Sequence, residues 1–72
     1  MHPIDSILNE YGVTRYQFNK EYGFSKNRLS NLILRDAPVE NLQVDIIHAM
    51  SVCFKISMDE VYAKLLAYEN NK

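Results

Sequence analysis

The sequence is poor in the features that mark a secreted or membrane protein. Its 72 residues include one cysteine, Cys53, so no internal disulfide can form. A chain this small without disulfides is typical of a reducing compartment, which predicts a cytoplasmic protein. No apolar run approaches the roughly 18 residues that suggest a membrane span, and the start, MHPIDSILNE, lacks the pattern of a signal peptide. We therefore expect no membrane association.

Motifs for metal binding and catalysis are also missing. His2, close to a start that we expect to be disordered, and His48 belong to no H-x-x-x-H pattern, and no C-x-x-C pattern is present. The chain has no glycine-rich phosphate loop and no evident Ser–His–Asp arrangement. Cys53 is interpreted as a small core residue, with a redox role as the alternative. These absences predict a protein that is not an enzyme and needs no metal or cofactor.

Charge is unevenly distributed along a chain whose formal net charge is −1. Residues 14–36 hold five basic and two acidic side chains, which gives this stretch a charge of +3. The remainder holds three basic and seven acidic side chains, a charge of −4. A basic stretch within an acidic protein indicates one face that suits a polyanion.

Three expected helix starts share one pattern, a Ser or Thr cap flanked by two apolar residues that can pack on each other. Thr14 is expected to cap one helix, with Gln17 completing a capping box. Ser25 is expected to cap the next helix, and Ser57 a later one with Glu60 completing its box. The apolar pairs around these caps are Val13 with Phe18, Phe24 with Leu29, and Ile56 with Val61.

Helical spacing of apolar residues accounts for the chain, and neither an alternating strand pattern nor an internal repeat is present. The pattern predicts an all-α fold, a compact five-helix bundle that forms a single domain over residues 1–72, with its core over about 4–69. The expected helices cover residues 4–11, 15–22, 26–34, 38–54 and 58–69. The residues expected to face inward are Ile4, Ile7, Leu8, Tyr11, Phe18, Tyr22, Leu29, Leu32, Ile33, Val44, Ile47, Met50, Phe54, Val61, Leu65 and Leu66.

The connection between the second and third expected helices consists only of GFS, residues 23–25. Gly23 can end one helix in the left-handed conformation, as Gly12 can end the first, and Ser25 can begin the next. Two helices joined by so short a turn form a helix-turn-helix, whose second helix presents its first-turn side chains outward. The sequence therefore predicts this motif over residues 15–34.

The stretches YGVTRYQFNKEYGFSKNRLSNLI, APVENLQV and FKISMDEV resemble the lambda-repressor-like helix-turn-helix family, which includes phage Cro and repressor DNA-binding domains. The resemblance extends over about residues 4–66. FKISMDEV is similar to the start of the family's fifth helix, often written G-V-S-L-D-E-L. The resemblance implies a five-helix fold and a sequence-specific transcriptional regulator of the Cro/repressor type that binds double-stranded DNA.

The resemblance makes residues 26–34 a recognition helix that enters the major groove. The positions that it assigns to DNA are Arg15 against the backbone, Ser25, Lys26 and Asn27 at bases and adjacent phosphates, and Ser30 and Asn31 at a further base. The side-chain chemistry agrees, because lysine can donate to guanine, asparagine can pair bidentately with adenine, and serine can donate or accept. Arg28 and Arg35 extend the set, since arginines make salt-dependent phosphate contacts.

Three positions depart from the family pattern. Asn19 stands where the family has a small residue beneath the turn, so we expect a changed angle between the two helices of the motif. Arg35 and Lys55 stand where glycine usually ends a helix, so each is expected to need a different cap or an uncommon backbone conformation. The connection RDAPVENLQV is longer than usual, which predicts an extra turn on the helix over residues 38–54.

The C-terminal helix raises the question of a partner. Family members often dimerise through the fifth helix, and the residues expected at such a homodimer interface are Tyr62, Leu65, Leu66 and Tyr68. Two paired domains would address half-sites about one helical turn apart. The alternative to DNA binding is a protein-interaction module on the same fold, an antirepressor or an antitoxin-like binder of a regulatory protein. The acidic remainder and the apolar fifth helix favour this alternative.

Overall fold

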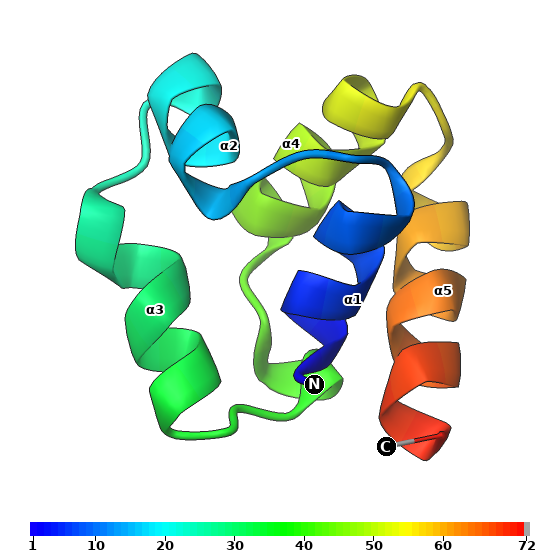
Figure 1. Cartoon of the computed structure of the whole chain (residues 1–72). Helices are drawn as coiled ribbons and strands as arrows, with labels where there is room; N and C mark the ends of the chain where they lie inside the picture. Colours follow the sequence, from blue (N-terminus) through cyan, green and yellow to red (C-terminus); the bar gives the residue numbers. More distant parts are fainter. Residues whose placement is uncertain (72) are drawn as a thin grey trace.

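The computed structural model describes residues 1–71, which form five α-helices and one 3₁₀ turn and contain no strand (Figure 1). The helices are α1 (Pro3–Glu10), α2 (Arg15–Tyr22), α3 (Lys26–Leu34), α4 (Val44–Phe54) and α5 (Met58–Asn70), and the 3₁₀ turn is η1 (Val39–Asn41). Figure 1 places α1 beside α5, with α3 on the opposite side of the bundle. The prediction of an all-α, compact fold is confirmed over these residues.

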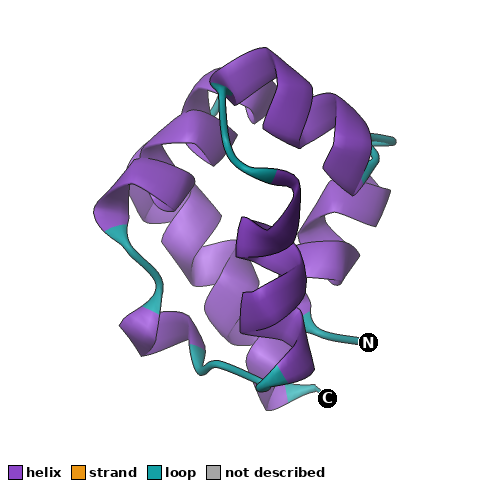
Figure 2. Cartoon of the chain, turned by 90° about the vertical axis from the view of Figure 1, so that its left-hand side faces the viewer, coloured by secondary structure: helices purple, strands orange, loops and turns teal. Residues whose placement is uncertain are grey.

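The core of the bundle is built around α5, which packs against α1, α4 and η1. Apolar residues from every helix meet in one buried cluster, and their removal from water is the main force that stabilises the fold. Figure 2 shows the connecting loops running over the outside of the bundle. The buried apolar residues are Ile4, Ile7, Leu8, Phe18, Leu29, Leu32, Ala37, Val39, Leu42, Ile46, Ile47, Ala49, Met50, Phe54, Val61 and Leu65.

The first residues are ordered by His2, so the expectation of a disordered start is wrong. The His2 side chain is buried, and its Nδ1 accepts a hydrogen bond from the Ile4 N–H at 3.1 Å. Its Nε2 lies 2.9 Å from the carbonyl oxygen of Ala37, and a neutral imidazole protonated at Nε2 satisfies both contacts. Pro3 suits the first helical position, so α1 begins one residue earlier than expected.

The predicted helix caps are confirmed in part. The Thr14 hydroxyl accepts from the Gln17 N–H, and the Gln17 side chain accepts from the Thr14 N–H, both at 3.0 Å, which completes the capping box. The Ser57 hydroxyl accepts from the Glu60 N–H at 3.1 Å, but the described contacts include no return bond to the Glu60 side chain. Ser25 occupies the N-cap position of α3 with an extended backbone, as predicted, but its hydroxyl makes no capping hydrogen bond.

The predicted continuous helix over residues 38–54 is wrong in its first part. Val39–Asn41 form only the 3₁₀ turn, the next two residues are extended, and α4 begins at Val44. The break allows the Leu42 side chain to enter the core, and the free N–H of Val39 donates to the Glu69 carboxylate at 2.8 Å. Because the helical register restarts, Val44 is 69% exposed instead of buried.

Four positions in the described chain adopt the left-handed conformation. Gly12 and Gly23 do so as predicted, with φ of 69° and 73°. Lys55 ends α4 with φ of 59°, which confirms the uncommon conformation expected there. At the end of α3 the left-handed residue is Asp36, with φ of 51°, whereas Arg35 has φ of −89°. The uncommon backbone conformation expected at Arg35 is therefore found one residue later, at Asp36.

Candidate nucleic-acid interface

The turn between α2 and α3 is held by hydrogen bonds and aromatic packing. Gly23 is left-handed, and the N–H groups of Gly23 and Phe24 both donate to the carbonyl oxygen of Asn19. The ring of the buried Phe18 lies 5.2 Å from the ring of Tyr22 and 5.5 Å from that of Phe24. Aromatic pairs at such distances attract each other, so this cluster fixes where α3 begins relative to α2.

Asn19 lies beneath this turn and is only 8% exposed. Its side-chain Oδ1 has no hydrogen-bond partner in the described part of the chain. A buried polar group left unpaired costs about 1–3 kcal/mol, which is unusual at a position where a small residue would serve. The changed angle between α2 and α3 that we expected from Asn19 stays a prediction.

α3 has one face in the core and one face in solvent. Leu29 and Leu32 are buried, whereas Lys26, Asn27 and Asn31 are exposed. Within residues 1–71 the side chains of these three polar residues form no hydrogen bond or ion pair. Their donors and acceptors are therefore left for an outside partner. Of the other predicted DNA contacts, Ser25 and Arg35 are also exposed and Ser30 is half-buried.

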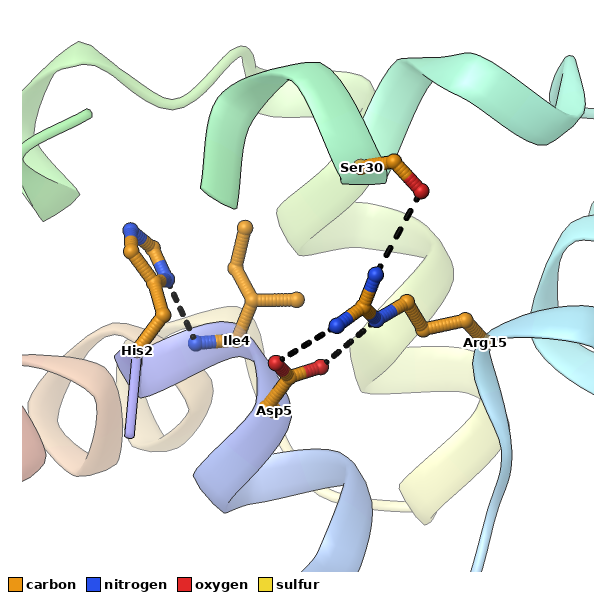
Figure 3. A network of polar contacts seen from close by, with 5 residues as sticks. All are labelled: His2, Ile4, Asp5, Arg15 and Ser30. Carbon is orange, nitrogen blue, oxygen red and sulfur yellow. Dashed lines mark hydrogen bonds and ion pairs between the residues drawn. The ribbon is translucent and has the colours of Figure 1, made fainter. Parts of the chain in front are cut away.

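Arg15, the first residue of α2, bridges three helices (Figure 3). Its Nε and Nη2 donate to the two carboxylate oxygens of Asp5 in α1, at 2.8 and 2.9 Å. Its Nη1 lies 3.4 Å from the hydroxyl oxygen of Ser30 in α3. Bidentate pairs of this kind restrict orientation as well as adding energy. Arg15 therefore helps to set the position of α3, a role that the sequence did not predict.

Arg28 makes a second link, from α3 to the start of α4. Its guanidinium donates to both carboxylate oxygens of Asp45, at 2.6 and 2.7 Å, and also to the side chain of Gln43. It lies 4.8 Å from the centre of the Phe24 ring, a cation–π contact. The hydrogen bonds from Arg28 hold the pKa of Asp45 below its usual value. Arg28 is thus committed to the protein itself rather than projecting freely toward a phosphate.

Three basic side chains of residues 14–36 stay outside ion pairs with the rest of the described chain, namely Lys20, Lys26 and Arg35. Lys20 was missed as a site residue; its Nζ lies 5.9 Å from the ring centre of the exposed Tyr16. A groove of about 420 Å³ separates α2 from the start of α3, and no carboxylate lines it. The lining residues are Arg15, Tyr16, Asn19, Lys20, Phe24, Lys26 and Ser30. Such a surface suits a phosphate.

A second groove, of about 250 Å³, lies between α3 and the segment that leads into α4. It brings together three of the predicted site residues, Arg28, Asn31 and Arg35, with two side-chain amides that sequence reasoning missed, Asn41 and Gln43. Nothing in the sequence relates these amides to α3, because their approach depends on the extended residues before α4. Six of the eight predicted site residues therefore line one or the other of these two grooves, whereas Ser25 and Asn27 line neither.

The predicted dimer residues on α5 are largely engaged within the chain. Leu65 is fully buried in the core and is not accessible to a second copy, so this part of the prediction is wrong. Leu66 and Tyr68 are half-buried, and the Tyr68 hydroxyl donates to the carboxylate of Glu10. Tyr62 is exposed at 36%. The α5 surface therefore offers less apolar area than its sequence suggested.

No model of a known protein family matches the sequence, and comparisons with the curated proteins and with solved structures yield no match either. The helices of residues 1–71 are all too short or too polar to cross a membrane. The functional reading of the α2–α3 surface consequently depends on its geometry and chemistry.

Proposed function

We propose that this protein is a sequence-specific, DNA-binding transcriptional regulator of the Cro/repressor type, with α3 in the major groove of double-stranded DNA. The observation that carries the proposal is the outer face of α3. Lys26, Asn27 and Asn31 are exposed there, and their side chains form no hydrogen bond or ion pair with the rest of residues 1–71. Lysine can donate to guanine and asparagine can pair bidentately with adenine, so this face has the chemistry that reads base edges.

The basic residues have two different roles, because some position α3 and others are available to bind phosphates. Arg15 and Arg28 form ion pairs with the carboxylates of Asp5 in α1 and Asp45 in α4, and in this way they hold α3 in place. Lys26 and Arg35 have no such partner in the described chain, and they stand near the two ends of α3. Phosphate contacts by Lys26 and Arg35 would then orient the helix while the face between them meets the bases, and the long Lys26 side chain can also reach a guanine next to its phosphate.

The test is a titration of duplex DNA over a range of salt concentrations. Wild-type affinity should fall steeply as salt increases, because each neutralised phosphate releases counterions. Lys26→Ala should reduce the slope of log Kd against log salt by about 1. Arg28→Ala should weaken binding with a smaller change of slope, because it acts through the position of α3. Lys64→Ala, on α5, is the control and should leave the slope unchanged.

A flat response to salt, or equal effects of Lys26→Ala and Lys64→Ala, would contradict the proposal. Selection of bound sites from a random DNA pool then tests sequence specificity directly. If the protein acts as a homodimer, the selected sites should contain two half-sites about one helical turn apart. A single unrepeated site would indicate a monomer.

A second candidate function, a protein-interaction module of the antirepressor or antitoxin-like kind, is favoured by the outer face of α4. Val44 and Val52 are 69% and 53% exposed, and with His48 they follow one helical stripe. Under this alternative, changing both valines to serine should abolish binding of a regulatory protein. Lys26→Ala should then have no effect on that complex.

A further inference from the structure

Leu34, the last residue of α3, is the most exposed of the large apolar side chains in residues 1–71, at 83%. The other leucines of α3, Leu29 and Leu32, are packed into the core. The apolar surface of Leu34, in contrast, is not buried within residues 1–71. Helix propensity does not explain the leucine either, because alanine favours a helix at least as strongly. An outside contact would give this leucine a use.

Leu34 shares the outer face of α3 with Asn27 and Asn31. At 3.6 residues per turn, positions 27, 31 and 34 fall within an arc of roughly 60° around the helix. All three side chains are exposed. The outer face therefore presents two amides followed by one alkyl group, in that order along the axis.

The distances along α3 match the spacing of base pairs. Seven residues rise by about 10.5 Å between Asn27 and Leu34, at 1.5 Å for each residue. Base pairs in B-DNA rise by about 3.4 Å along the duplex axis, and their edges are somewhat farther apart along the inclined major groove, so the two side chains would meet base pairs about two to three steps apart. Asn31 and Leu34 are about 4.5 Å apart along the axis, or roughly one step. The face can thus address consecutive positions of one groove.

The major groove offers one apolar group, the C5-methyl of thymine, and apolar side chains recognise it by contact. We propose that Leu34 is a specificity-determining residue that packs on a thymine methyl group, about one base pair from the base that meets Asn31. This inference rests on the proposed function, since it requires α3 to lie in the major groove. It adds thymine to the polar contacts of Lys26 and the two asparagines.

The test uses a duplex selected by the wild-type protein, in which each thymine is replaced in turn by deoxyuridine. This replacement removes only the methyl group. At one position the wild-type Kd should increase about fourfold, the effect of one buried methylene-sized group. Leu34→Ala should bind the thymine duplex with a similar loss and should show no further loss on deoxyuridine at that position. Because Leu34 is exposed, this variant should fold normally.

Val52→Ala is the matched control, since Val52 is an exposed aliphatic residue on α4, and it should keep the wild-type response to deoxyuridine. The inference is overturned if no single thymine matters, or if Leu34→Ala responds to deoxyuridine as the wild type does; in both cases DNA binding itself stands. It is likewise overturned if Leu34→Ala changes only the mass of the protein in solution, which would make Leu34 a protein contact. If the wild type binds no duplex at all, the proposed function fails as well.

Discussion

The two sides of this bundle differ in how much apolar packing holds their helices together. On one side, α5 packs along α1 and α4, and wholly buried residues such as Leu65 fill the space between them. On the other side, α2 and α3 bury only Phe18, Leu29 and Leu32 in the core. Two ion pairs also tie them to the rest, Arg15 with Asp5 and Arg28 with Asp45. Apolar burial thus dominates the first side, which also contains the Lys64–Glu10 ion pair, whereas the position of α3 depends more on charged contacts.

This difference shows why net charge overstates the capacity of the basic stretch to bind phosphates. The five basic residues within positions 14–36 look equivalent in the sequence. In the fold, Arg15 and Arg28 are oriented by carboxylates from α1 and α4, so they act as supports for α3. Lys20, Lys26 and Arg35 remain for an outside anion. The acidic partners that make this division come from the other side of the bundle.

The largest effect should come from the apolar side. Leu65→Ala should lower the free energy of unfolding by about 2–5 kcal/mol, because it removes a fully buried side chain and leaves a cavity. Urea unfolding followed by circular dichroism measures this loss, and an unchanged m-value would show that the compactness of both states is kept. Leu66→Ala, at a half-buried neighbour, should lose clearly less. Equal losses would contradict the packing of α5 described above.

An intermediate effect on stability is expected at two helix ends. Gly23 ends α2 and Lys55 ends α4, and both residues are left-handed. Lys55→Gly should raise the free energy of unfolding by about 1 kcal/mol, because glycine adopts a positive φ without the strain of a Cβ. Gly23→Ala should lower it by about 1 kcal/mol for the same reason. A Cβ at Gly23 would meet no atom within 4 Å, so the backbone is the whole cause. Thermal unfolding of both variants measures these changes. A Gly23→Ala variant more stable than the wild type would contradict the role given to the left-handed backbone.

The helices on both sides could be predicted because their signals are local. The bounds of α2 and α3 agree with those expected, since Thr14 with Gln17 and the left-handed Gly23 act within a few residues of the chain. The break before α4 could not be predicted, because Leu42 turns inward to fill a space that exists only when the bundle is assembled. The exposure of Val44 follows from that break.

The residue types of the candidate site could be predicted from the sequence, but the side chains that pair with its arginines could not. The exposed polar face of α3 follows from helical spacing around Leu29 and Leu32, and Leu34 could have been found in the same way. The partners Asp5 and Asp45 lie 10 and 17 residues from their arginines, and no sequence pattern joins them. Only the assembled fold brings Asp5 of α1 to Arg15 of α2, and Asp45 of α4 to Arg28 of α3.

The smallest effect, and the one that compares the two sides most directly, is the dependence of stability on pH. Asp45 on the α3 side and Glu10 on the α1–α5 side both have their pKa lowered, Asp45 by hydrogen bonds from Arg28 and Glu10 by hydrogen bonds from Lys64 and Tyr68. A carboxyl group whose pKa is lowered by folding stabilises the protein above its unfolded pKa of about 4. That contribution is lost as the pH falls through the lower pKa of the folded state.

Asp45→Asn and Glu10→Gln should therefore be less stable than the wild type at pH 7, and the difference should disappear as the pH falls through the lowered pKa values of the folded state and the wild-type carboxyls become protonated. Both groups lie at the surface, so each difference should be small and should shrink further in high salt. Backbone amide spectra separate the two sides at pH 7. Asp45→Asn should shift the amides of α3, because it releases Arg28, whereas Glu10→Gln should shift those of α1 and α5. If Asp45→Asn leaves the α3 amides unmoved, aromatic packing at the α2–α3 turn is sufficient to position α3 and the charged contacts are dispensable.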